Sequence, residues 1–261
     1  MRARRAPGRF AAVFLLTLSL AACSSSSSST PGPSGPPTTP TPPSARARVL
    51  MLTATAGFRH DSIAAARQAM TAMAASTGAF TVDATEDLSS ITSATLANYD
   101  VLFFALTSGE LAFTADQRTA ILNWVSAGGG FLGAHSATDT LYGWPEYGAL
   151  IGAYFREHPW TQSATVVIED RSHPATGGAA ERFVINEEFY AFRDNPRGRV
   201  QVLLHLDAAS VGASGDYPLA WAHSHGSGRV YYNALGHFPA TWQEPWFQRQ
   251  IAAAIAWAAR R

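Results

Sequence analysis

GGGFLGAHSATDT, residues 128–140, contains a short apolar run, residues 130–134, that stops at a histidine. A run that is apolar on both faces is typical of a strand in a parallel sheet that helices cover on both sides. Because ligands bind outside the carboxyl ends of the strands in open parallel sheets, the turn after this strand would present His135 to a binding cleft. An imidazole donates and accepts protons near neutral pH, so His135 is the first candidate catalytic residue.

The sequence before this run alternates apolar runs with helical patterns. We predict strands at residues 48–53, 80–85 and 99–106, a helix over 63–73 and a helix from Thr114 to Gly128. Asp61 or Ser62 is the expected cap of the first helix, and Thr114 opens a capping box with Gln117 in the second. The alternation reaches about residue 153, and it predicts right-handed crossovers in a doubly wound, mainly parallel α/β sheet.

The C-terminal half has a different pattern. Short apolar and aromatic runs predict strands at residues 164–169, 183–193, 200–207, 219–223 and 229–235. A turn at residues 226–228 joins the last two strands as a hairpin. A helix from about Glu244 closes the chain, with Pro245 in its first turn. We therefore expect antiparallel strands added to the parallel sheet, within one α/β domain over residues 46–261.

The N-terminus is typical of an exported protein. After a basic start, residues 10–20 are apolar, a length that suits an export signal and is short for a membrane span of roughly twenty residues. Leu20-Ala21-Ala22-Cys23 resembles the lipobox of bacterial lipoproteins, whose cysteine is lipidated. Residues 24–45 are rich in serine, proline and threonine and predict a disordered tether. We expect a signal peptide over residues 1–23 and a lipid anchor that holds the protein in the cell envelope, facing the periplasm or the cell exterior.

Composition excludes several classes of function. Lysine plus arginine equals aspartate plus glutamate, at 19 each, and several arginines belong to the signal, so nothing favours a nucleic-acid partner. Cys23 is the only cysteine, which leaves no thiol nucleophile in the domain. Glycines 128–130 precede a strand and lack the order of a dinucleotide-binding loop. Ser136 lacks the flanking glycines of an α/β-hydrolase elbow.

Two further histidines are predicted at carboxyl ends of strands. His60 follows the first strand, and His237 follows the last strand through a glycine, so both would converge with His135 in the predicted sheet. Asp139 either orients one of these imidazoles or caps the next helix. Over residues 183–193, period-two alternation turns one of the two glutamates at 187 and 188 inward and the other outward. We select Glu188 as the inward one.

This residue set suits two kinds of chemistry. Neutral imidazoles with one carboxylate are ligands for zinc and neighbouring divalent metals, and the same groups act as general acids and bases. The candidate metal ligands are His60, His135, His237 and Glu188, and the candidate acid–base residues are the same four with Asp139. The spacing does not choose between the two chemistries. The histidines at positions 158, 173 and 205 are interpreted as hydrogen-bonded structural residues.

Aromatic side chains suit the apolar faces of sugar rings, and the chain has seven tryptophans. Core packing is the alternative role for any one of them. The candidate substrate-binding residues are Arg59, Trp144, Tyr190 and Trp221.

Six ordered motifs resemble the ThuA (trehalose utilisation) family over nearly all of residues 48–258. They are residues 57–63 (GFRHDSI), 133–139 (GAHSATD), His158-Pro159, His173-Pro174, Glu188-Phe189-Tyr190, and 228–232 (GRVYY) with 234–237 (ALGH). The resemblance implies a flavodoxin-like fold of the class I glutamine amidotransferase type, whose nucleophile lies in the turn after the fourth strand. Because that turn holds His135 here, we expect no amidotransferase activity.

The family resemblance also implies a substrate class. The family is associated with catabolism of trehalose and related disaccharides, and it resembles proteins that act on 3-keto sugars made by a partner dehydrogenase. We therefore expect His/Glu acid–base chemistry on a keto sugar, with or without a divalent metal. The alternative is a glycan-binding surface lipoprotein without catalytic activity. Imidazoles clustered at one place favour the enzyme, whereas scattered imidazoles beside exposed tryptophans favour the binding protein.

Overall fold

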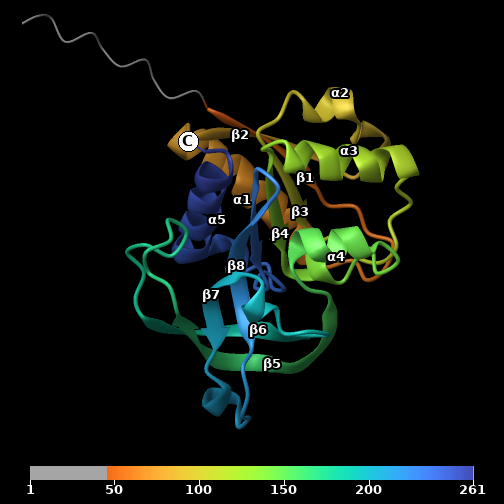
Figure 1. Ribbon diagram of the computed structural model, residues 1–261. Coiled ribbons are helices and arrows are strands. Elements are labelled where there is room, and N and C mark those ends of the chain that lie inside the picture. Colours follow the sequence, from red (N-terminus) through yellow and green to blue (C-terminus); the bar gives the residue numbers. More distant parts are fainter. Residues whose placement is uncertain (1–45, 261) are drawn as a thin grey trace, which may run out of the picture. The chain divides into compact units, whose positions relative to one another are not determined.

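The computed structural model describes residues 46–260, and its sheet begins with five parallel strands in the order β2-β1-β3-β4-β9 (Figure 1). The strands are β1 (Ala47–Leu52), β2 (Phe80–Thr85), β3 (Val101–Ala105), β4 (Gly130–Ala134) and β9 (Gly228–Asn233). Adjacent members pair in parallel throughout. With β9 as the fifth strand this is the flavodoxin-like order 2-1-3-4-5, so the predicted fold class is confirmed.

Four antiparallel strands continue the sheet beyond β9, as predicted for the C-terminal half. They are β8 (Pro218–His225), β7 (Gln201–Leu206), β5 (Phe155–Ile168) and β6 (Arg182–Phe192), in this spatial order. The predicted hairpin joins β8 to β9. However, β5 begins at Phe155 rather than at residue 164, and its early part pairs with β6 through register shifts at Glu157 and Trp160. This longer β5 brings residues 155–163 next to the two glutamates of β6.

Helices cover both faces of the parallel part. In Figure 1, α1 (Ser62–Thr77) and α5 (Pro245–Ala258) lie on one side, whereas α2 (Ser93–Leu96), α3 (Ala115–Ser126) and α4 (Pro145–Ile151) lie on the other. Short 3-10 turns complete the described part: η1 (Leu88–Ser90), η2 (His135–Thr138), η3 (Pro196–Gly198), η4 (Ala208–Val211) and η5 (Thr241–Gln243). The apolar stripe of α5 is buried at positions 247, 251, 254, 255 and 258.

The predicted capping signals have different outcomes. Thr114 accepts the backbone N–H of Gln117, and the Gln117 side chain accepts the N–H of Thr114, so the capping box is present. At the start of α1, Asp61 occupies the cap position without a side-chain hydrogen bond. Ser62 instead donates its hydroxyl to the carbonyl of Gly236 at 2.9 Å. This bond ties the start of α1 to the loop after β9.

Close packing fixes the end of β4. A Cβ added at Gly133 would lie 2.8 Å from the Cδ1 of Ile151 and 3.0 Å from the Cδ2 of Tyr232, so a larger residue here would force these side chains to shift. No helix in residues 46–260 is long and apolar enough to cross a bilayer. The predicted signal peptide, Cys23 and the tether fall outside the described residues.

Candidate functional site

The turn after β4 holds His135 in a strained backbone conformation. His135 has φ +50°, in the left-handed region that a residue with a side chain rarely adopts. Such strain costs about 1–3 kcal/mol and persists where surrounding bonds fix it. Here the Tyr232 hydroxyl donates to the carbonyl of His135 at 2.7 Å, and the Tyr147 hydroxyl donates to the carbonyl of Ala137 at 2.6 Å. The turn therefore aims a fully buried imidazole at the carboxyl edge of the sheet.

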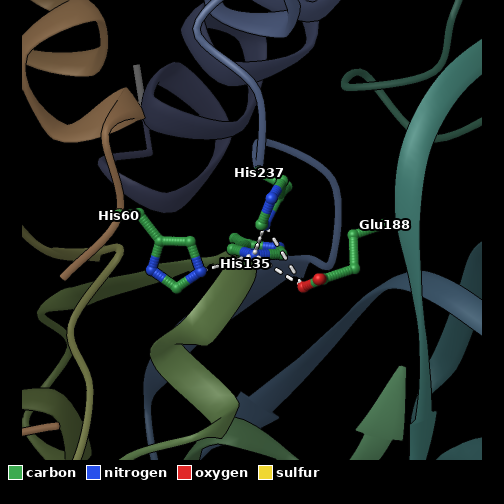
Figure 2. A group of neighbouring side chains, drawn as sticks. All are labelled: His60, His135, Glu188 and His237. Atoms are coloured by element: carbon green, nitrogen blue, oxygen red, sulfur yellow. Dashed lines mark hydrogen bonds and ion pairs between the residues drawn. The ribbon is translucent and has the colours of Figure 1, made fainter. Parts of the chain in front are cut away.

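Three histidines and one glutamate meet at this edge (Figure 2). The Nε2 atom of His135 lies 3.0 Å from Nε2 of His60, 3.2 Å from Nδ1 of His237 and 3.5 Å from Oε2 of Glu188. The same Glu188 oxygen lies 3.2 Å from Nδ1 of His237. His60 follows β1, His135 follows β4, His237 follows β9 and Glu188 belongs to β6. The predicted convergence of the three histidines is thus present in the structure, and Glu188, selected as an inward residue, joins them.

The hydrogen bonds of His135 fix which of its nitrogens faces the cluster. Nδ1 of His135 lies 2.8 Å from the carbonyl of Ala234, which can only accept, so Nδ1 carries the proton. Nε2 of the neutral ring therefore points its lone pair toward the neighbouring imidazoles. Nε2 of His60 lies 3.0 Å from Nε2 of His135. Two nitrogen lone pairs at this distance would repel each other, so a proton or a cation must lie between the two atoms.

The spacing of the four side chains fits a metal centre. Two ligands of one zinc ion, each at its usual bond length in a tetrahedral arrangement, are about 3.4 Å apart. The four separations given above run from 3.0 to 3.5 Å, and all four ligand atoms lie within 4.8 Å of one another. A carbonyl that orients a ligating imidazole through its other nitrogen is a common outer partner in metal sites. The donor set and its support therefore suit a divalent metal.

Burial and neighbouring charges shift the pKa values of three of these groups. Burial, reinforced by the neighbouring His135 and His237, lowers the pKa of His60 to about 3. Burial alone would raise the pKa of Glu188, but hydrogen bonds with His135 and His237 outweigh it and hold that pKa far below its usual value. The same bond with Glu188 raises the pKa of His237. At neutral pH the site therefore contains a neutral His60 beside an ionised Glu188.

Both glutamates of β6 are buried, which corrects the expected alternation. Glu187 is fully buried rather than exposed. Its carboxylate accepts the backbone N–H groups of Gly236 and Phe238, at 3.3 Å each, and the hydroxyl of Thr241 at 3.2 Å. Burial raises the pKa of Glu187. Glu187 thus holds the loop that carries His237, and alternation fails because residues 187–192 of β6 are covered on both faces.

Asp139 does not contact the imidazoles through any described hydrogen bond. Its carboxylate accepts the hydroxyl of Tyr142 at 2.6 Å, and burial raises its pKa. In this structure Asp139 therefore fills neither of the two predicted roles: it does not orient an imidazole, and the cap position of the next helix, α4, is Trp144. Tyr190 does reach the cluster: its hydroxyl lies 3.0 Å from Nε2 of His135, and burial raises its pKa well above the usual value, so it remains protonated as a donor.

Two predicted substrate-binding side chains are core residues, whereas a third, Arg59, lies on the surface beside His60. Trp221 is fully buried and donates its indole N–H to the carbonyl of Ile151, and Trp144 is 4% exposed. Both are core residues, so the expectation that they contact a substrate is corrected. Arg59 is exposed and paired with Glu86 at 2.9 Å. None of the seven tryptophans, all of which the structure describes, is exposed.

The structure adds residues that the sequence did not single out for function. His158, interpreted as structural, lies on the early part of β5 with Nδ1 3.4 Å from Oε1 of Glu188, and its side chain is 53% exposed. Two phenylalanine rings lie against cluster imidazoles. Phe58, which is 66% exposed, packs edge to face against His60, with ring centroids 4.8 Å apart. The ring centroids of Phe238 and His237 are 4.7 Å apart. An exposed aromatic ring beside a buried polar cluster is a surface for a ligand.

Comparisons with known proteins agree with the fold. A model of the family described as ThuA, trehalose utilisation, matches residues 48–258. A comparison with curated proteins gives no match. Among solved structures, a protein described as ThuA-like from Bacteroides uniformis superposes with a TM-score of 0.70 at 22% identity, over 84% of this chain and 95% of its own.

Two other solved structures are similar. A protein described as ThuA-like from Parabacteroides merdae has a TM-score of 0.68 at 18% identity, over 82% of this chain and 90% of its own. A protein described as cytoplasmic, from Salmonella typhimurium, has a TM-score of 0.57 at 11% identity, over 81% of this chain and 98% of its own. At these identities the likeness concerns the fold alone.

Proposed function

Since the chain belongs to the ThuA (trehalose utilisation) family, we propose that it is an enzyme that abstracts a proton next to the carbonyl of a 3-keto-glycoside. The substrate would derive from trehalose or a related disaccharide. One observation supports the proposal most strongly. Three imidazoles and one carboxylate from four separate segments place their ligand atoms within 4.8 Å of one another, at the edge of the sheet where ligands bind.

The chemistry of a 3-keto sugar requires few groups. The C–H at carbon 2 is acidified by the neighbouring carbonyl, and its removal leaves an enolate with negative charge on the carbonyl oxygen. The enolate is then protonated at carbon 2 from the opposite face, which epimerises the sugar, or it expels the glycosidic oxygen from carbon 1, which breaks the glycosidic bond. A positioned base and a group that stabilises the enolate oxygen are sufficient for either outcome.

This chain offers candidates for both roles. The half-exposed His158, whose Nδ1 lies 3.4 Å from Oε1 of Glu188, is placed to accept the proton from carbon, and Glu188 orients its ring. Tyr190, whose hydroxyl stays protonated, is placed to donate to the enolate oxygen. A divalent metal held by His60, His135, His237 and Glu188 would supply Lewis-acid stabilisation of the same oxygen when bound. Residues 46–260 contain no cysteine, so the domain offers no thiol for amidotransferase chemistry.

The surroundings favour catalysis over simple glycan binding. The imidazoles are clustered, and no exposed tryptophan is present among residues 46–260. Phe58 and Phe238, which lie beside His60 and His237, are suited to contact the apolar face of a sugar ring. The buried cluster and its adjoining rings thus have the composition of a small-molecule site, with a few polar groups among apolar ones.

The location of the enzyme rests on residues 1–45. The lipobox-like sequence ending at Cys23 and the following tether support an exported, lipid-anchored protein of the cell envelope. In that compartment the enzyme would receive its keto sugar from a partner sugar dehydrogenase, because oxidation at carbon 3 must precede the proposed reaction.

A time course with 3-keto-glucosides and their parent disaccharides tests this function. The purified protein should consume one or more keto sugars, leave the unoxidised parents unchanged and lose activity with a chelator, recovering it when zinc or manganese is added back. His135→Ala should be inactive, whereas His205→Gln, a histidine on β7 outside the cluster, should keep full activity. If the whole panel is inert with metal present, the proposed function is wrong.

A further inference from the structure

A cavity of about 540 Å³ lies between α5 and the loop of residues 174–180. Its volume is within the usual range of small-molecule pockets, roughly 300–1,000 Å³. The loop side consists of small residues, and Phe183 and Trp246 contribute aromatic rings that lie 4.4 Å apart. None of the residues that line this cavity belongs to the histidine cluster, so it is a separate candidate site.

The spacing of residues on α5 shows that a distinct helix face lines the cavity. Trp246, Arg249, Gln250 and Ala253 follow the i, i+3, i+4, i+7 pattern of one side of a helix. The apolar residues of α5 that pack into the core are at other positions, 247, 251, 254, 255 and 258. Gln250 lies at the border between this core face and the cavity face. This second face therefore presents two long polar side chains to a cavity rather than to the protein core.

Gln250 has a buried donor without an acceptor. The backbone N–H of Leu235 donates to Oδ1 of Asn233 at 3.0 Å, which fixes the orientation of that amide. Nδ2 of Asn233 then donates to Oε1 of Gln250 at 3.2 Å, so the NH₂ group of Gln250 is the end that remains. Gln250 is 3% exposed, and its Nε2 has no partner among the described residues. Leaving such a buried group unpaired is unfavourable, and a ligand that accepts its hydrogen bond would remove this cost.

The charge of the cavity points to an anion. Arg249 is an exposed lining residue and makes no ion pair or hydrogen bond with any residue from 46 to 260. None of the residues that line the cavity is acidic. The cavity thus combines a guanidinium and an amide donor with two aromatic rings and lacks a carboxylate to neutralise the arginine. A carboxylate accepts such donors in strong, charge-assisted hydrogen bonds.

We propose that this cavity binds a monocarboxylate with an apolar body. The carboxylate accepts from Arg249 and from Nε2 of Gln250, and the apolar body packs against Phe183 and Trp246. The site is independent of the proposed reaction, because it shares no lining residue with the histidine cluster.

Calorimetric titration of the full chain with sodium octanoate, and with octan-1-ol as the uncharged analogue, tests the proposal. Octanoate should bind with saturation. In Arg249→Gln its affinity should fall about tenfold or more, the factor expected for loss of a charge-assisted hydrogen bond, while octanol binding is unchanged. Ala253→Leu, which places a larger side chain in the cavity, should weaken both ligands. Arg156→Gln, an exposed arginine on β5, should alter neither.

Several results would overturn the proposal. They are a titration without saturable octanoate binding, equal octanoate affinity in Arg249→Gln, and undiminished binding in Ala253→Leu. Sedimentation provides a further check on the occupant. A dimer that dissociates in Ala253→Leu would assign the cavity to a second copy of the chain and would also refute a carboxylate site.

Discussion

Addition of a divalent metal should stabilise this protein against thermal unfolding. In the structure the Nε2 atoms of His60 and His135 lie 3.0 Å apart, and the carboxylate of Glu188 lies 3.5 Å from His135. An unfolded chain does not hold these groups together, so a metal that binds the folded cluster contributes its binding free energy to stability.

The size of the effect follows from mass action. At a free metal concentration 100 times the dissociation constant, the gain in unfolding free energy is about 2.7 kcal/mol. The described domain has about 215 residues, and for a domain of that size each kcal/mol raises the Tm by about 2–4 °C. We therefore expect zinc or manganese to raise the Tm by about 5–11 °C.

Differential scanning calorimetry with metal and with chelator measures this shift. His135→Ala and His237→Ala should each lose most of it, since each removes one ligand of the four. His205→Gln, which alters a histidine paired with Glu169 outside the cluster, should keep the whole shift. A Tm that is the same with metal and with chelator would refute the metal centre, as would an undiminished shift in His135→Ala.

Three further predictions concern packing, substrate contact and pH. Gly133→Ala should lower stability by about 1–3 kcal/mol in urea unfolding, because its Cβ would lie 2.8 Å from Ile151; an unchanged midpoint would contradict the packing argument. Phe58→Ala should raise KM for the keto sugar with little change in kcat, whereas Val184→Ala, an equally exposed apolar residue, should leave both unchanged. Burial lowers the pKa of His173 in the folded protein, so the folded state favours the neutral imidazole. The contribution of His173 to the stability of the protein is therefore complete above the unfolded-state pKa of about 6.5, and it is lost as the pH falls toward the lower pKa of the folded state. Unfolding free energies at pH 5 and 7.5 should therefore differ less in His173→Asn than in the wild type, and equal differences would exclude His173 as the cause.

Local sequence signals are sufficient for most of the parallel half. The strands β2 and β4 have the predicted bounds: β4 is a short apolar run, and in β2 the apolar residues at 80, 82 and 84 alternate with polar ones. The meeting of His60, His135 and His237 could also be predicted, since carboxyl ends of parallel strands share one edge of the sheet. In a parallel sheet, a residue that follows the carboxyl end of its strand can therefore be placed at a known edge of the sheet.

Features that depend on long-range pairing could not be predicted in this way. The early part of β5 is mostly exposed and polar, and only its pairing with β6 makes it a strand, so the place of His158 beside Glu188 was not predicted. Glu187 breaks the expected alternation because the loop after β9 covers the second face of β6. The burial of Trp221 likewise arises in part from contacts with Phe192 and Ile151, which are distant in sequence.

Hydrogen–deuterium exchange at the substrate carbon tests the central claim most directly. A 3-keto-glucoside incubated with metal-loaded protein in D₂O should gain deuterium at carbon 2, followed by NMR, and His135→Ala should abolish the gain over the uncatalysed background. The account is contradicted if the wild-type protein gives no exchange above background, or if the variant exchanges deuterium as fast as the wild type.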